Sequence, residues 1–213
     1  MRSPKTFSLQ VKKDHYFNLK YDTKARWISY WYQIKEVISQ NPREALEIGV
    51  GNKIVSDYLK KVGIIVKTCD FDERLKPDVV ASVTKLPFKK GSFDTVLCAE
   101  VLEHLPFREF KKSLKEIHRV TRKKAIITLP HISLTNLYFG FKIIPFLPKR
   151  EFAAKVDYPF KHKFEGEHYW EIGKRGYGLK KVTEAISRTG FKVEKTYYPP
   201  ENPKHQFFIL KKE

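Results

Sequence analysis

The chain has 213 residues, enough for one α/β domain with a buried core but too few for two domains of ordinary size. It contains no run of about 18 apolar residues, and its first residues are polar and basic. The sequence therefore predicts a cytoplasmic protein without a membrane-spanning helix or a secretory signal. Cys69 and Cys98 lack the CxxC spacing of a metal site, so we expect both to be reduced and buried.

The formal net charge is +18, which favours an anionic partner. RNA and a phosphorylated or carboxylated small molecule both fit this description. A highly charged solvated surface is the alternative, because basic pairs are spread along the whole chain. The sequence does not show whether these side chains converge on one face.

Short apolar runs bounded by turn residues predict strands, and near-helical apolar spacing predicts the helices between them. In chain order the predicted elements are helix 24–39, strand 45–48, helix 53–62, strands 64–69, 78–81 and 93–99, helix 106–120, strand 125–129, helix 179–189, and strands 191–198 and 206–210. Because buried strands alternate with helices, we expect a Rossmann-like α/β fold. Its sheet would be mainly parallel and seven-stranded, with helices on both faces.

Residues 131–177 differ from the rest of the chain, since they are rich in aromatic residues, proline and charge without a long regular period. This composition predicts an inserted cap over the sheet rather than a further layer. Aromatic residues such as Phe139, Phe146 and Phe160 are expected to give the cap an apolar wall.

The first predicted strand ends in Glu47-Ile48-Gly49-Val50-Gly51, a turn in which Gly49 and Gly51 let the backbone lie close to a ligand. Ligands of open α/β sheets bind at the carboxyl ends of the strands. A dinucleotide-binding turn needs a third small residue where this chain has Ile54, which argues against a nicotinamide cofactor.

An acidic residue follows the second predicted strand, and Asp70 lies 19 positions after Gly51. A carboxylate there can accept hydrogen bonds from both ribose hydroxyls of a nucleoside. Asp72 competes for the same role, and the spacing alone leaves the choice open.

Four segments in order resemble the class I S-adenosylmethionine-dependent methyltransferases, of the methyltransferase type 11 kind. The segments are Leu46-Glu47-Ile48-Gly49-Val50-Gly51, Cys69-Asp70-Phe71-Asp72, Leu86-Pro87-Phe88 with Gly91-Ser92-Phe93-Asp94, and Glu100-Val101-Leu102-Glu103-His104-Leu105. The resemblance implies the class I methyltransferase fold, S-adenosyl-L-methionine as cofactor and methyl transfer as the activity. It also divides a single domain, 1–213, into an N-terminal helical lid (1–42), a cofactor-binding core (43–130), the cap (131–177) and a C-terminal helix with strands (178–213).

The resemblance further implies which residues of the turn bind the cofactor. Gly49 and Gly51 would contact its methionine and ribose parts, and Glu47 would hold its ammonium group. Asp70 would bind the ribose diol, with Asp72 as the competitor.

The later motifs would complete the cofactor site by the same resemblance. Ser82 and Val83 would line the adenine, and Glu100 and Val101 would close the pocket beneath the methionine arm. The chain departs from the family pattern at two positions. Lys53 replaces a third glycine, and Ser82 replaces an aspartate that binds the adenine amino group.

Candidate acceptor-side residues follow the fourth and fifth strands and continue into the cap. His104 is the first candidate for a general base, and His131 is a candidate for catalysis and substrate contact. His168 and Trp170, in the cap, are candidates for substrate binding. A packed structural histidine is the alternative for both His104 and His131.

A histidine with carboxylates also raises the question of a metal, since Glu165, Glu167 and Glu171 surround His168. Their spacing fits no standard metal site, so the sequence predicts none.

The N-terminal helix carries a dense aromatic cluster at Trp27 and 30–32. Tyr30 and Trp31 are candidates for a lid over the cofactor, with plain packing as the alternative. Lys20 and Arg26 are candidates to meet the cofactor carboxylate.

Three functions compete at this point. A methyltransferase acting on a small or medium-sized metabolite is favoured by the aromatic cap, which can exclude water. An RNA methyltransferase is favoured by the charge. A nicotinamide enzyme or an inactive cofactor-binding protein is disfavoured by Ile54 and by the set from Glu47 to Asp70. The acceptor atom and the oligomeric state stay open.

Overall fold

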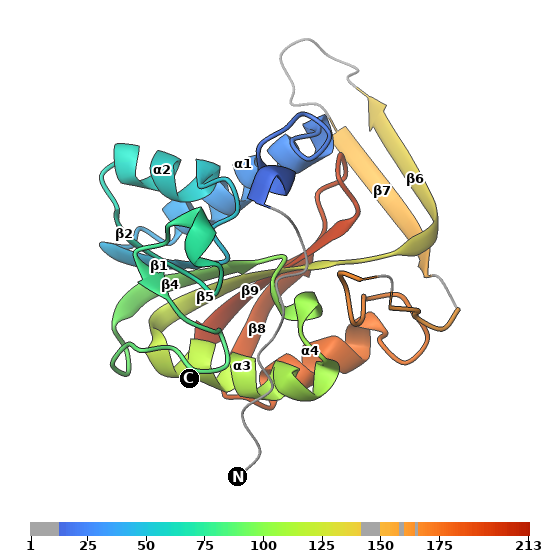
Figure 1. Cartoon of the computed structure of the whole chain (residues 1–213). Coiled ribbons are helices and arrows are strands. Elements are labelled where there is room, and N and C mark those ends of the chain that lie inside the picture. The colour runs from blue at the N-terminus through green and yellow to red at the C-terminus, as the bar shows by residue number, and fades with distance from the viewer. Residues whose placement is uncertain (1–12, 142–149, 158–159, 165) are drawn as a thin grey trace.

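The computed structural model describes residues 13–141, 150–157, 160–164 and 166–213 (Figure 1). Its main sheet has seven strands in the order β3-β2-β1-β4-β5-β9-β8. These strands are β1 (Glu44–Ile48), β2 (Ile65–Asp70), β3 (Val79–Val80), β4 (Phe93–Ala99), β5 (Thr121–Pro130), β8 (Phe191–Tyr197) and β9 (His205–Lys212). Strands β1 to β5 are parallel, and β9 runs antiparallel to both of its neighbours. The predicted mainly parallel seven-stranded sheet is confirmed.

The strand order places a reversal at β1, which lies between β2 and β4. The chain first extends the sheet on one side through β2 and β3, then crosses to the other side of β1. In the register, Ile48 lies opposite Cys69 of β2 and Cys98 of β4. The carboxyl ends of these strands therefore meet at one edge, where open α/β sheets bind ligands.

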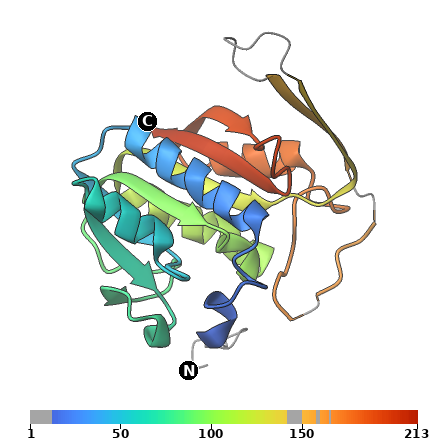
Figure 2. The ribbon, with the colours of Figure 1, turned by 90° about the horizontal axis from the view of Figure 1, so that it is seen from above.

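Helices cover both faces of the sheet (Figures 1 and 2). The helices α1 (Lys24–Ser39) and α2 (Ile54–Lys61) lie on one face, and α3 (Phe107–Val120) and α4 (Leu179–Ser187) lie on the other. Short 3-10 turns occur as η1 (Lys13–Tyr16), η2 (Glu73–Leu75) and η3 (Leu102–His104). The Thr23 side chain caps α1 by accepting a hydrogen bond from the Arg26 N–H at 3.3 Å.

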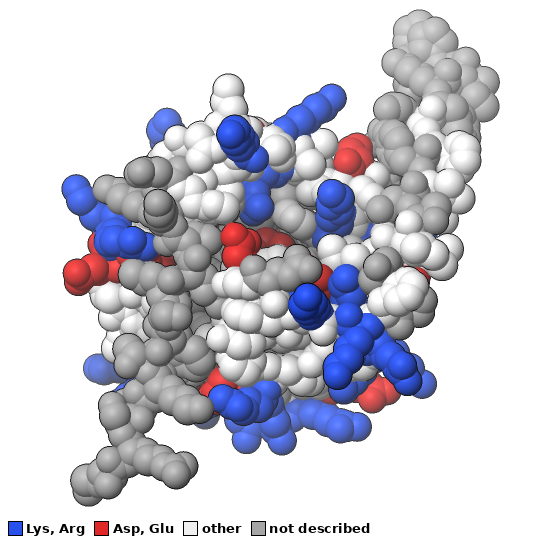
Figure 3. Space-filling model, turned by 45° about the vertical axis from the view of Figure 1, so that its right-hand side comes forward, with Lys and Arg blue, Asp and Glu red and all other residues white. Residues whose placement is uncertain are grey.

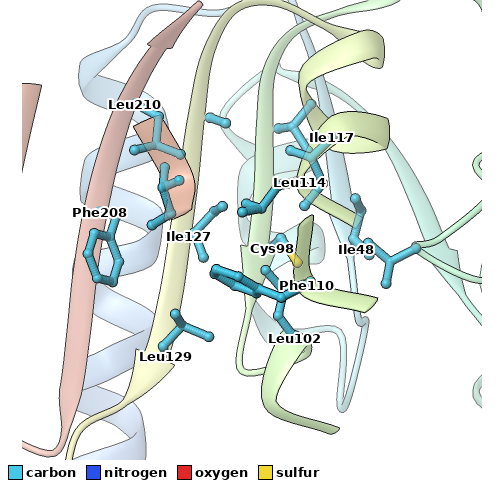
Figure 4. Close-up of a cluster of buried hydrophobic side chains, with 14 of the residues drawn as sticks. Ile48, Cys98, Leu102, Phe110, Leu114, Ile117, Ile127, Leu129, Phe208 and Leu210 are labelled. Atoms are coloured by element: carbon cyan, nitrogen blue, oxygen red, sulfur yellow. The ribbon is translucent and has the colours of Figure 1, made fainter. Parts of the chain in front are cut away.

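Alternation along β1 explains how one strand serves two cores. Leu46 and Ile48 pack on the α3 side, whereas Ala45 packs on the α1 side. Figure 4 shows the α3 side, where Phe110, Leu114 and Ile117 meet the sheet. Each of these fully buried side chains contributes about 1.5–3 kcal/mol relative to exposure.

The cap contains two strands that the sequence did not predict, β6 (Ser133–Phe141) and β7 (Arg150–Asp157). They form an antiparallel pair outside the main sheet and stand away from it (Figure 1). Phe139 and Phe160 are exposed, which corrects the expected apolar wall at these positions. Phe146 lies outside the described residues.

Within the described ranges, the structure has no helix that is both long and apolar enough to cross a membrane.

Candidate active site

The turn after β1 is hydrogen-bonded to the end of β2 and packs closely on a side chain that follows β4. Gly49 has φ +84°, and its N–H donates to the Cys69 carbonyl at 2.9 Å. A Cβ at this position would lie 2.2 Å from Val101 Cγ2. Glycine is therefore required both by its left-handed backbone and by the side chain that packs beneath it.

Asp70 joins the end of β2 to this turn. Its carboxylate accepts hydrogen bonds from the Val50 N–H and the Asp72 N–H, each at 2.9 Å. Burial raises the pKa of Asp70, and the two backbone donors oppose that rise. The structure thus places Asp70 beside the glycine turn.

Asp72, the competitor, has a different environment. Its side chain accepts from the Arg74 N–H at 3.0 Å and forms an ion pair with the Arg74 guanidinium at 2.7 Å. These contacts make Asp72 the cap of η2. The geometry favours Asp70 over Asp72 for ligand contact.

Glu47 points to the α2 face of the sheet and is buried. Burial raises its pKa to about 8, and hydrogen bonding to Ser56 opposes that rise. Its Oε2 has no hydrogen-bond partner among the described residues. A cationic or donor group beside this oxygen would relieve the cost of its burial.

Lys53 takes the place of the third family glycine, and the backbone there keeps the glycine conformation. Its φ is +65°, in the left-handed region, at the N-cap of α2. A side chain in this region costs about 1 kcal/mol relative to glycine. The Lys53 ammonium donates a hydrogen bond to the Lys76 carbonyl, and this contact holds the Lys53 side chain in place.

Ser82 and Val83 follow β3 at the same edge as Asp70. The Ala81 N–H donates to the Asp70 carbonyl at 2.8 Å, which fixes the start of this segment. The Ser82 hydroxyl bonds to the Thr84 hydroxyl at 2.9 Å, and the Val83 side chain packs in the core. Because the Val83 side chain lies in the core, its backbone is the part of Val83 that a ligand at this edge could contact.

Glu100 ends β4 with a strained backbone, since its φ of +53° is rare for a residue with a Cβ. The Thr128 hydroxyl donates to its carboxylate at 2.8 Å, and His205 Nε2 lies 3.6 Å away. Such strain is enriched at functional sites, so this end of β4 is a candidate functional position, and Asn41 and Lys76 share the positive φ elsewhere in the chain.

Glu103 is fully buried beside Glu100. Neither of its carboxylate oxygens has a hydrogen-bond partner among the described residues. Burial, followed by the charge of Glu100, raises the pKa of Glu103 well above its ordinary value. The sequence drew no attention to this residue beyond its place in the fourth motif.

His104 and His168 come together although they are far apart in the chain. Their rings lie 4.9 Å apart in an edge-on arrangement. His104 Nδ1 lies 3.2 Å from the Glu167 carbonyl, and His168 Nδ1 lies 2.8 Å from Glu171 Oε1. Burial, with the neighbouring His168, lowers the pKa of His104 to about 4, so its ring is neutral near pH 7.

His131 is buried, and both of its ring nitrogens have partners. Nδ1 lies 3.0 Å from Gln206 Oε1, and Nε2 lies 2.9 Å from Asp157 Oδ1. This arrangement fixes the ring between β9 and the end of β7. A role of His131 in substrate contact or catalysis stays a prediction.

Trp170 is a core residue, which corrects its expected contact with substrate. It is fully buried, packs on Phe107, Phe110 and Tyr177, and donates its indole N–H to the Leu105 carbonyl at 3.2 Å. Its large apolar surface anchors the cap to α3, so none of it remains for a ligand.

The residues over the glycine turn come from before α1 and were not predicted. A Cβ at Gly51 would lie 3.7 Å from Tyr16 Cδ1 and 3.9 Å from the Tyr21 hydroxyl. Arg26 stacks on the Tyr21 ring at 4.2 Å. A cluster of aromatics directly before a predicted helix was the available signal.

The two predicted lid residues of α1 differ in burial. Trp31 is 56% exposed, and its role as a lid stays a prediction. Tyr30 is buried, and its hydroxyl donates to Asp22 at 3.2 Å and accepts from the Asn52 amide at 3.0 Å. It therefore supports the turn from the side.

One cavity of about 530 Å³ lies away from these residues and is lined by Glu44, Lys67 and Phe88, among others. Glu44 begins β1, so this cavity opens at the amino-terminal edge of the sheet. It is distinct from the carboxyl edge that carries the candidate site.

Comparison with known proteins places this geometry in a family. Residues 46–129 match the family described as "Methyltransferase domain". Two uncharacterised proteins of Methanocaldococcus jannaschii are similar to the chain. One is 30% identical over 129 residues, 57% of this chain and 49% of that protein. The other is 44% identical over 59 residues, 28% of this chain and 25% of that protein.

Solved structures share the fold. The 1,6-didemethyltoxoflavin-N1-methyltransferase of Burkholderia thailandensis, crystallised with 1,6-didemethyltoxoflavin and S-adenosylhomocysteine, superposes with a TM-score of 0.61. The identity is 13%, over 94% of this chain and 86% of that one. The matched part of the chain spans about a quarter of the length of one curated relative and about half of the length of the other. Residues 46–129 thus belong to the methyltransferase domain family, and the chain that contains them has the class I methyltransferase fold.

Proposed function

We propose that the chain is an S-adenosylmethionine-dependent methyltransferase that methylates a small or medium-sized metabolite. The observation that carries the proposal is the hydrogen bond from the Val50 N–H to Asp70 Oδ2 at 2.9 Å. It joins the glycine turn and the acid of the neighbouring strand into one surface. A nucleoside with an amino acid arm needs both parts of that surface.

The residues present fit the proposed cofactor. Glu47 offers a buried oxygen without a partner among the described residues, which suits the cofactor ammonium group. Asp70 has acceptor capacity for the ribose hydroxyls beyond its two backbone donors. Gly49 and Gly51 lack a side chain that would keep a ligand away from the backbone, and Val101 packs beneath Gly49.

The remaining cofactor contacts follow from position. Ser82 and Val83 lie beyond Asp70, where the adenine would be, and Glu100 lies toward the methionine arm. The bound cofactor supplies an activated methyl group on a sulfonium, and the protein supplies alignment and an environment for charge.

Protein groups on the acceptor side can hold and orient the nucleophile. Neutral His104 can accept a hydrogen bond from the acceptor, because its pKa is about 4 and its ring is uncharged near pH 7. Tyr16 and Tyr21 cover the turn and limit access of water. His168 extends this wall from the cap.

A small acceptor is favoured over RNA by the way the site is covered. Segments from the N-terminal region and the cap both reach the carboxyl edge, which encloses an acceptor rather than opening to a polymer. In Figure 3, Lys and Arg are scattered over the face and are densest at its lower right and lower edge, with acidic side chains among them. The similar Burkholderia protein was crystallised with 1,6-didemethyltoxoflavin, which supports the same choice.

Transfer of a radiolabelled methyl group from the cofactor into cell extract tests the proposal. The extract is separated into metabolite, RNA and protein fractions, and Gly49→Val serves as the inactive control. We expect label in the metabolite fraction with the wild-type chain only. Label in RNA would replace the metabolite acceptor, and no label in any fraction would contradict the activity.

A further inference from the structure

Three potential metal ligands meet at the acceptor side of the site. Glu103, His104 and His168 each offer one ligand atom, and these atoms lie within 4.8 Å of one another. The first two residues follow β4 in η3, and the third comes from the cap. The cluster therefore exists only in the folded chain, and the spacing of residues 165–171 alone could not reveal it.

The carboxylate of this cluster points to a ligand independently. Glu103 is fully buried, and both of its oxygens lack a hydrogen-bond partner among the described residues. A buried carboxyl group without partners costs several kcal/mol unless something compensates it. Residues at this position in a purely structural role would be apolar or hydrogen-bonded.

The two imidazoles are oriented in the manner of metal ligands. Metal-binding histidines usually donate their second ring N–H to a carboxylate or a backbone carbonyl. His168 Nδ1 lies 2.8 Å from Glu171 Oε1, and His104 Nδ1 lies 3.2 Å from the Glu167 carbonyl. In this orientation His104 Nε2 faces Glu103, at 3.9 Å from Oε1.

The outer carboxylate is itself held in place. Glu171 Oε2 lies 3.6 Å from His162 Nδ1, and His162 Nε2 lies 2.8 Å from the His168 carbonyl. His162 and Glu171 therefore brace the His168 ring from behind. Such outer contacts typically change metal affinity by about 10–100-fold when they are removed.

We propose that Glu103, His104 and His168 bind one divalent transition metal ion. Two imidazoles and one carboxylate form the facial set that suits Mn²⁺, Fe²⁺, Co²⁺ or Zn²⁺ and leaves coordination positions open. Glu103 and His104 lie two and three residues after Val101, which packs beneath Gly49, so the ion would lie on the same side of the sheet edge as the glycine turn. If the proposed function holds, an acceptor hydroxyl on the ion would lose its proton more easily and become the nucleophile.

Direct metal binding tests the site without reference to activity. The untagged full chain is freed of metal and titrated with Co²⁺, with calorimetry and visible absorption as readouts. We expect one Co²⁺ per chain with ligand-field bands, and binding at least tenfold tighter than that of Mg²⁺. Failure of the wild-type chain to bind Co²⁺, or equal affinity for Mg²⁺, would overturn the proposal.

Matched variants assign the ligands. We expect Glu103→Gln and His168→Ala each to weaken Co²⁺ binding by at least about 100-fold, and Glu171→Gln by about 10–100-fold. His118→Ala, which alters a histidine on α3 outside the cluster, should leave the affinity unchanged. Wild-type affinity in both ligand variants would overturn the assignment. Glu103→Gln keeps the shape of the side chain, and circular dichroism verifies that each variant is folded.

A parallel titration with S-adenosylhomocysteine separates this proposal from the proposed function. Binding of S-adenosylhomocysteine without binding of Co²⁺ contradicts the proposed metal site but not the proposed function. Binding of Co²⁺ without S-adenosylhomocysteine binding supports the metal site and contradicts the methyltransferase proposal.

Discussion

The glycine turn after β1 and the cap segment around residues 160–172 lie at the same edge of the sheet but reach it by different routes. The turn, Asp70 and Val101 come from the ends of three neighbouring parallel strands, and backbone hydrogen bonds of the sheet fix their positions. The cap reaches the edge through the packing of Trp170 against α3 and through backbone hydrogen bonds of Tyr169 and Ile172 to residues far away in the sequence. Positions set by strand register can be predicted from short motifs, whereas positions set by long-range packing cannot.

Among the substitutions that test this comparison, removal of the Trp170 side chain, which anchors the cap, should have the largest effect. We expect Trp170→Ala to lower the free energy of unfolding by about 3–5 kcal/mol, because removing this large, fully buried side chain leaves a cavity in the core. Urea denaturation measures the change. Tyr169→Ala, at a 37% exposed neighbour, is the control and should cost much less. Equal effects of the two variants would contradict the anchoring role.

The glycine turn should respond to a single methyl group. We expect Gly49→Ala to lower the unfolding free energy by about 2–4 kcal/mol and to abolish binding of S-adenosylhomocysteine, because the new Cβ collides with Val101. Gly63→Ala shares nearly the same backbone, φ +90°, but no described heavy atom lies within 4 Å. It should cost only about 1 kcal/mol and spare binding. Similar losses in both variants would show that strain, not the Val101 contact, governs the turn.

The motif half of the site could be predicted from the sequence for a physical reason. Glycines in a tight turn and an acid at a strand end are recognisable from a few neighbouring residues, so the sequence predicts Gly49 and Asp70 without knowledge of the fold. His205 and Tyr21 carry no such signal, because β9 pairing and the segment before α1 bring them to the edge. The same holds for the pairing of His104 with His168. The sequence did not predict β6 and β7 because the apolar residues of this segment follow no long regular period, and Leu137 and Phe139 are exposed in the folded chain.

Substitution of Asp70 and of Asp72 compares the contributions of two acids of one motif to cofactor binding. We expect Asp70→Ala to weaken S-adenosylhomocysteine binding by about 1–3 kcal/mol, since it removes ribose hydrogen bonds and the brace to Val50. Asp72→Ala, which breaks the ion pair with Arg74, should have a smaller effect on binding. Isothermal titration calorimetry measures both. The reverse order would assign the ribose to Asp72.

Glu47 should give an effect of a different kind, a change in the slope of stability with pH. Its pKa is raised to about 8 from an unfolded value of about 4.5, so the folded chain holds a proton that the unfolded chain releases. The stabilisation is complete below pH 4.5 and is lost as the pH rises toward 8, by at most about 1.4 kcal/mol per pH unit. We expect Glu47→Gln to remove this slope in urea titrations, with Glu44→Gln at the other end of β1 as the control. An unchanged slope would contradict the buried, protonated state.

The account depends most on a nucleoside with an amino acid arm binding across Gly49 and Asp70. Calorimetric titration of the full chain with S-adenosylhomocysteine and, separately, with NAD⁺ tests this most directly. We predict saturable one-to-one binding of S-adenosylhomocysteine, at least tenfold tighter than that of NAD⁺ and lost in Gly49→Ala. Tighter binding of NAD⁺, or binding of S-adenosylhomocysteine that survives in Gly49→Ala, would contradict the account.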